Sequence, residues 1–316
     1  NNPSFLVSSF PPPSLPPCLP FFLPYPRISL SHIQLCILLG FFISREELFM
    51  PSTEKNLHEP MYYFLSMLSA TDLGLSLCTL STTLGVFWFE AREININTCI
   101  AQMFFLHGFT FMESGVLMAM AFDRFVAICD PLRYTTILTN VRIAQIGITV
   151  LIRNVGIMLP VVLFVKRLSF CKSMVLSHSY CYHVDLIQLS CTDNKINSIL
   201  GLLALFSTTG FDCPCILLSY VLIIRSVLRI ASSEERQKAF NTCISHISAV
   251  AIFYIPLISL SLVHRYGHSA PPFVHTIMAN VFLLIPPVLN PIIYSVKTKQ
   301  IRKAVIMVLT QKQVQI

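Results

Sequence analysis

Long apolar segments separated by short polar ones dominate the pattern of this chain. A helix needs about 20 mostly apolar residues to cross the hydrocarbon core of a bilayer, and six segments have that length between charged or turn-forming residues. An earlier, seventh segment is shorter and is diluted by Ser29, Ser31, His32 and Gln34. The expected spans are 28–44, 60–89, 98–127, 143–165, 199–224, 239–263 and 273–296. The pattern therefore predicts an all-α membrane protein, a seven-transmembrane helix bundle.

Composition and charge agree with this fold class. Of the 316 residues, 54% are hydrophobic and only 12% are charged, which is too apolar for an ordinary soluble domain. If the amino terminus lies outside the membrane, 14 Lys and Arg residues fall on the inner side and seven on the outer side, with Arg153 inside a span. This excess predicts a multi-pass protein with an outer amino terminus and an inner carboxyl terminus. The net charge of +7 then reflects topology, and no nucleic-acid partner is expected.

The two ends of the chain differ from the spans. Nine of the 20 prolines lie within the first 26 residues, and because proline lacks an N–H donor, residues 1–27 are expected to form an irregular extracellular leader. Residues 28–296 then form the seven-transmembrane domain. Charged and apolar residues alternate along 297–316, which predicts a short amphipathic helix and tail on the cytoplasmic side.

Four cysteines fall on the predicted outer face, where the environment is oxidising. An even number of cysteines in such a compartment suggests two disulfides, and four cysteines allow three pairings. They are Cys99, Cys171, Cys181 and Cys191.

Charged residues within or beside the spans are the strongest candidates for function, because hydrocarbon rejects them. Asp72 and Glu113 are acids inside spans, and Asp123 and Arg124 stand together at the inner end of the third span. On charge alone, the last two could equally be an anchor at the membrane interface.

Several motifs give these residues a context. The segments LHEPMYYFL (57–65), MAFDRFVAIC (120–129), KAFNTCISH (238–246) and NPIIY (290–294) follow one another along the chain. In order and spacing they resemble the signatures of vertebrate olfactory receptors, which are rhodopsin-like G-protein-coupled receptors of the plasma membrane. The resemblance covers about residues 56–305, and FDR in place of YDR is similar to the class I, fish-like branch. It implies a receptor that binds a small odorant and activates a stimulatory, cAMP-raising heterotrimeric G protein.

The resemblance also implies roles for individual residues. Asp123 and Arg124 would lock the inactive state, with a partner hinge at Asn290, Pro291 and Tyr294. Asp72 and Glu113 match the positions of a buried site for a sodium ion. A simple hydrogen-bonded pair of acids without an ion is an equal alternative.

For the ligand, the resemblance points to a carboxylic acid bound in the outer half of the bundle. His107, His183 and Arg265 would hold the carboxylate, since guanidinium and imidazole groups donate directed hydrogen bonds to it. Met158 and Val161 would form an apolar wall that limits chain length. The disulfides implied are Cys99 with Cys181 and Cys171 with Cys191.

Three other functions are weighed against this one. An enzyme is not expected, because the sequence shows no metal-ligand or nucleophile spacing. A transporter is disfavoured because no internal repeats are evident. A receptor-like product with a defective amino terminus remains a further alternative, because the first 55 residues lack the family's usual pattern.

Overall fold

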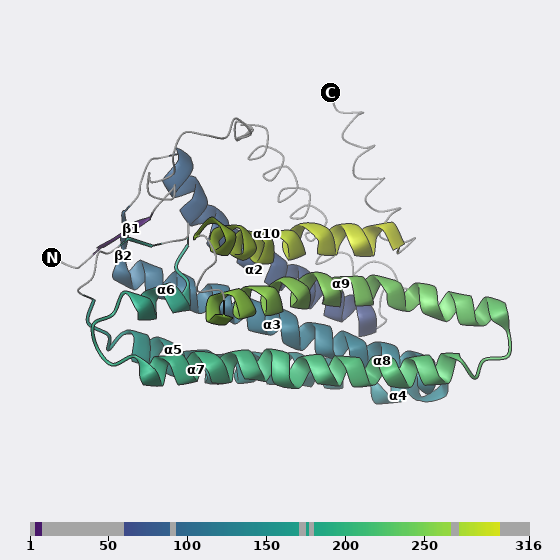
Figure 1. Ribbon diagram of the computed structural model, residues 1–316. Helices are drawn as coiled ribbons and strands as arrows, with labels where there is room; N and C mark the ends of the chain where they lie inside the picture. The colour runs from purple at the N-terminus through teal and green to yellow at the C-terminus, as the bar shows by residue number, and fades with distance from the viewer. Residues whose placement is uncertain are drawn as a thin grey trace, which may run out of the picture.

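The structure is a computed structural model, and it describes residues 4–7, 60–88, 93–170, 175–176, 180–266 and 272–297. Most of these residues are helical (Figure 1). The long helices are α2 (Pro60–Trp88), α3 (Ile96–Cys129), α5 (Asn140–Val165), α7 (Lys195–Leu205), α8 (Cys213–Val227), α9 (Ser233–Tyr266) and α10 (Pro272–Lys297). Shorter elements are η3 (Pro131–Arg133), α4 (Tyr134–Ile137), α6 (His183–Gln188) and the strands β1 (Ser4–Val7), β2 (Glu93–Asn95) and β3 (Val175–Leu176).

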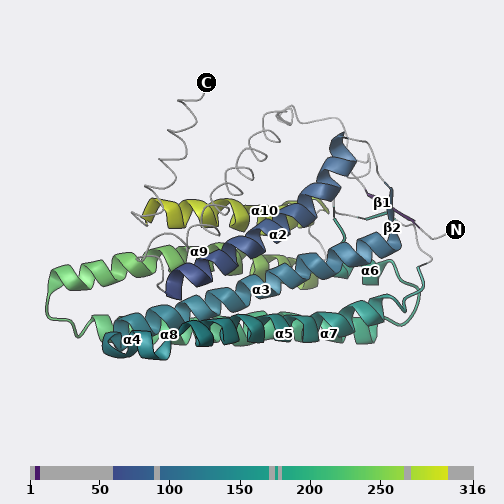
Figure 2. The ribbon, with the colours of Figure 1, turned by 180° about the vertical axis from the view of Figure 1, so that it is seen from behind.

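The long helices form a bundle arranged around α3. Helix α3 packs against α2, α5, α8 and α9, and α10 closes the bundle between α9 and α2 (Figures 1 and 2). Five helices of the described part are long and apolar enough to cross a membrane. Helix α3 is not among these five, although it covers the predicted span 98–127. Each predicted span from residue 60 onward corresponds to observed helix, while the expected first span (28–44) and the tail beyond 297 lie outside the described residues.

Local signals explain where several helices begin and end. The side chain of Asn95 accepts a hydrogen bond from the backbone N–H of Asn97 and caps α3 (2.9 Å). Thr139 caps α5 in the same way, as is usual for these residue types. Pro131 follows α3 directly and cannot continue its hydrogen bonds.

The fifth predicted span is continuous but not regular. Between α7 and α8, the segment η4 (Phe206–Asp212) is a π-helix. Pro214 has no N–H for the carbonyl of Gly210, and its ring would crowd that carbonyl in a regular helix. The wider turn avoids this conflict, and short π-helical segments often mark functional positions. Hydrophobic periodicity alone did not predict it.

The expectation of an irregular leader needs one correction. Ser4–Val7 forms strand β1, which pairs with β2 and β3 in a sheet of order β2–β1–β3. No proline stands between Ser4 and Phe10, and a short apolar run with a β-branched valine suits a strand. Figures 1 and 2 place this sheet at one end of the bundle, beside the first turns of α3 and near α6.

Candidate functional site

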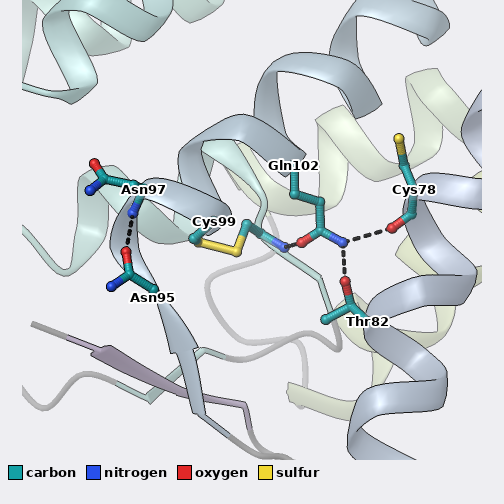
Figure 3. The surroundings of a disulfide bond; sticks show 7 residues. Cys78, Thr82, Asn95, Asn97, Cys99 and Gln102 are labelled. Atoms are coloured by element: carbon teal, nitrogen blue, oxygen red, sulfur yellow. Dashed lines mark hydrogen bonds between the residues drawn. A yellow bond between two sulfur atoms is a disulfide. The ribbon is translucent and has the colours of Figure 1, made fainter.

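A disulfide ties the loop after α5 to the outer end of α3. Cys99 is bonded to Cys181, which confirms the first expected pairing. Beside the bridge, the side-chain amide of Gln102 donates hydrogen bonds to the carbonyl of Cys78 (2.9 Å) and to Thr82. Its oxygen accepts the backbone N–H of Cys181 (3.0 Å). One buried glutamine thus fixes the loop to α2 and α3 (Figure 3).

The second expected bridge is only partly within the described residues. Cys191 is disulfide-bonded, while Cys171 lies outside the part of the chain that the structure describes. The side chain of Arg265, near the end of α9, is also outside the described residues.

A cavity of about 260 Å³ lies beneath the loop that follows Cys181. Four predicted ligand residues line it: His107 from α3, Met158 and Val161 from α5, and His183 from α6. The other lining residues are Thr110, Phe111, Tyr182, Val184, Ile187, Ser198, Gly201, Leu202, Ala204, Leu205, Leu257, Ser261 and Phe282. The walls are mostly apolar with a few hydroxyl and imidazole groups, which is typical of a small-molecule site. Thr110, Gly201 and Ser261 were not predicted.

The two histidines present unused hydrogen-bonding groups. Nε2 of His107 and Nε2 of His183 are both buried and have no hydrogen-bond partner among the described residues. The ring of His107 lies near those of Tyr182 and Phe111, with ring centroids 5.1 and 6.4 Å away. Burial lowers the pKa of His183 to about 4, so its ring is neutral at neutral pH. A buried polar atom without a partner is costly, and a polar ligand head would satisfy both.

A second polar cluster lies deeper, between α2, α3 and α10. Nδ2 of Asn290 donates to both carboxylate oxygens of Asp72 (3.2 Å each) and to Oε1 of Glu113 (3.1 Å). All three side chains are buried, and Oδ1 of Asn290 has no partner among the described groups. The structure therefore brings the two predicted acids together around one amide.

At the inner end of α3, the two predicted switch residues form an ion pair. Nη2 of Arg124 lies 2.9 Å from Oδ2 of Asp123. Tyr134, in α4, donates a hydrogen bond to the other carboxylate oxygen (2.7 Å). The carboxylate of Asp123 is buried, so both contacts hold a charge that would otherwise be poorly solvated.

A large cavity of about 1030 Å³ opens beside this ion pair. Arg124 and Tyr294 line it, together with Lys238 from the first turns of α9 and His246 further along that helix. Nδ1 of His246 is 2.6 Å from Oη of Tyr220. Pro291 is buried one turn before Tyr294 in α10. Two of the predicted switch residues, Arg124 and Tyr294, thus line one opening at the inner end of the bundle.

One charged network was missed by the sequence reasoning. Arg153 of α5 forms two hydrogen bonds with Asp212 of η4, at 2.5 and 2.8 Å. Ser114 of α3 donates to the same carboxylate (2.7 Å) and is 2.8 Å from Oη of Tyr254 in α9. Because the Ser114 proton goes to the carboxylate, Tyr254 donates to Ser114. Gly115 leaves room for α5 beside this network, since a Cβ there would lie 2.6 Å from Cγ1 of Val150 and 3.1 Å from Nη2 of Arg153.

A signal for this network was present in the sequence. Arg153 and Asp212 are ionisable residues of opposite sign in successive predicted spans, at similar distances from the outer ends. Charges inside a membrane usually pair with one another. Their meeting depends on how α5 and η4 face each other, which periodicity does not specify.

Comparisons with known proteins are in line with this geometry. A family model described as olfactory receptor matches residues 30–312. Human olfactory receptor 51F2 is 83% identical over 282 residues, covering 89% of this chain and 82% of that receptor. Human olfactory receptor 51F1 is 66% identical over 265 residues, covering 84% and 83%. The crystal structure of squid rhodopsin matches with a TM-score of 0.70 and 17% identity over 92% of this chain and 88% of that one, which confirms the predicted fold class.

Proposed function

Because the chain belongs to the olfactory receptor family, we propose that it binds a small carboxylic acid beside His107 and His183 and signals through a stimulatory, cAMP-raising G protein. Membership itself makes the protein a multi-pass receptor of the plasma membrane with its amino terminus outside, and not an enzyme. It also implies a small-molecule ligand and a G-protein partner. The ligand class and the type of G protein are our proposals.

The two unpartnered imidazole nitrogens are the observation that carries the ligand proposal. A carboxylate is an acceptor with about four lone-pair directions, so it accepts hydrogen bonds from two imidazole N–H groups at once. The remaining walls, including Met158 and Val161, suit an alkyl chain. Arg265 would supply the charged donor at the outer end of α9, because guanidinium binds carboxylates through two parallel hydrogen bonds.

The inner cavity supports the signalling part of the proposal. In the state described here, Arg124 is held by Asp123 while also lining the opening. Outward movement of the first turns of α9 would widen this opening and let Arg124 contact a G protein. Asn290, Pro291 and Tyr294 would form the hinge of α10. Ligand binding then shifts an equilibrium between two arrangements of the helices.

We also propose that the cluster of Asp72 and Glu113 takes up a sodium ion. Two carboxylates and the unpartnered Oδ1 of Asn290 are hard oxygen donors of the kind that hard cations prefer. In the alternative, the acids share the Asn290 amide without an ion. Sodium-dependent thermal stability that is lost in Asp72→Asn would support the ion, whereas equal stability in sodium and choline salts would favour the pair alone.

The test is cAMP accumulation in cells that display the receptor, with an outer tag to quantify surface expression. Straight-chain acids from butanoic to nonanoic are compared with the matching alcohols. We expect the acid responses to be lost in Arg265→Ala while any response to a neutral odorant remains. Uptake of the compound without a cAMP signal would favour a transporter. Absence from the surface would favour the product with a defective amino terminus.

A further inference from the structure

We propose that Gly201 is a specificity-determining positioning residue: it forms a notch in α7 that seats the imidazole of His183 and so aims Nε2 into the cavity. The proposal deepens the ligand site and rests on the proposed function for its ligand-dependent part. Its structural part, the fit between one glycine and one histidine ring, stands independently of any ligand.

The contact is tight and specific. A Cβ added at Gly201 would lie 2.8 Å from Cε1 and 3.0 Å from Nδ1 of His183. Its three nearest neighbours are all atoms of this one ring. Separations under about 3.5 Å between carbon atoms are repulsive, so any larger residue at 201 must displace the imidazole from its position.

Gly201 lies on the part of α7 that lines the cavity, so its missing side chain can affect ligand binding. Ser198, Gly201 and Leu205 follow one another at helical spacing, and all three line the cavity. Gly201 therefore lies on the face of α7 that lines the cavity, where the proposed ligand would bind. The Cε1–Nδ1 edge of the His183 ring faces the glycine. Nε2, on the other side of Cε1, would lie 4.0 Å from the added Cβ; it is buried and without a partner among the described residues.

Displacement of the ring would change ligand recognition more than cavity size. A methyl group at 201 meets the ring before it meets any other described atom. The expected result is loss of one directed hydrogen bond to the ligand head, while the apolar walls formed by Met158 and Val161 stay in place. The variant should therefore respond less to oxygen-bearing heads and should not change its preference for chain length.

The chain offers a matched control in Gly156 of α5. A Cβ there meets nothing within 4 Å, and both glycines lie inside long helices, where alanine is intrinsically favoured over glycine. Any difference between Gly201→Ala and Gly156→Ala therefore reports the contact with His183 and not the change of residue type.

The first experiment needs no ligand. The apparent Tm of the purified full-length receptor is measured for Gly156→Ala, Gly201→Ala, His183→Ala and the double variant Gly201→Ala/His183→Ala. We expect Gly201→Ala to lower the Tm in the wild-type background and not to lower it once His183 is removed. If Gly201→Ala alone fails to reach the cell surface, the double variant should restore surface display. Equal effects of Gly201→Ala in both backgrounds, with or without His183, would overturn the proposal.

The second experiment measures EC50 values for the acid, from butanoic to nonanoic, that gives the strongest wild-type response. Loss of a hydrogen bond to a charged head should raise the EC50 of Gly201→Ala about tenfold or more. In the His183→Ala background the same change should have less than about a twofold effect, because the two residues act as one unit. An equal increase in both backgrounds would contradict the positioning role. If no acid activates the wild type, the acid proposal fails while the Tm comparison still decides the role of Gly201.

Discussion

The ion pair between Arg153 and Asp212 should be a major source of stability, and only as a pair. Asp212 is 0% exposed and Arg153 is 25% exposed, and they meet through two hydrogen bonds of 2.5 and 2.8 Å. Replacing Arg153 by methionine leaves a buried carboxylate whose remaining hydrogen bond comes from Ser114. Removing one partner of a buried pair typically costs about 3–5 kcal/mol, because the other charge is left without compensation.

Removing both charges together should cost much less stability than removing Arg153 alone. The double variant Arg153→Met/Asp212→Leu has no buried ion to stabilise, and apolar replacements of buried ion pairs are often neutral or stabilising. We therefore expect the double variant to recover most of the stability that Arg153→Met loses. The assay is unfolding of the purified receptor in lipid–detergent micelles by titration with sodium dodecyl sulfate.

A surface pair of the same charge types provides the control. Lys195 and Asp193 are 3.9 Å apart and are 84% and 70% exposed, so Lys195→Met should change the free energy of unfolding by less than about 1 kcal/mol. A loss of unfolding free energy in Arg153→Met no larger than that in Lys195→Met would contradict this expectation. So would a double variant whose loss of unfolding free energy equals the sum of the losses in Arg153→Met and Asp212→Leu.

Three further predictions concern the disulfide-linked loop that carries Cys181 and His183, and the ion pair of Asp123 and Arg124. Gln102→Leu should destabilise the receptor by about 1–3 kcal/mol, because the buried N–H of Cys181 loses its acceptor; an unchanged Tm would contradict this role. Burial lowers the pKa of His183 to about 4 from about 6.5 when unfolded. Protons then bind preferentially to the unfolded chain between these values, so stability should fall as pH falls through this window, and more steeply than in His183→Gln. Asp123→Asn should raise basal cAMP by releasing Arg124, and basal activity equal to wild type at equal surface level would argue against the lock.

Much of the helical framework could be predicted because bilayer thickness requires about 20 mostly apolar residues in every span. The segment 60–89 matches α2 and 143–165 lies within α5. What the pattern did not predict depends on local chemistry. The π-helical turn before Pro214 is one example, and the pairing of β1 with strands far along the chain is the other.

The candidate site shows the same division. His107, His183, Met158 and Val161 were named through motif resemblance, and the structure brings all four to one cavity. The role of Gly201 was missed, because a glycine matters only through what approaches it in space. For the same reason, no spacing along the chain showed that Asp212 would face α5.

The most direct test of the account is the cAMP response to the acid series in cells with verified surface display, comparing the wild type with His107→Leu/His183→Leu. The account predicts a saturable response of the wild type to at least one acid. It also predicts loss of that response in the double variant at equal surface level, because the two unpartnered imidazoles that line the cavity are removed. A response unchanged by the double substitution would contradict the proposed site, and a surface-displayed wild type silent to every acid would contradict the proposed ligand class.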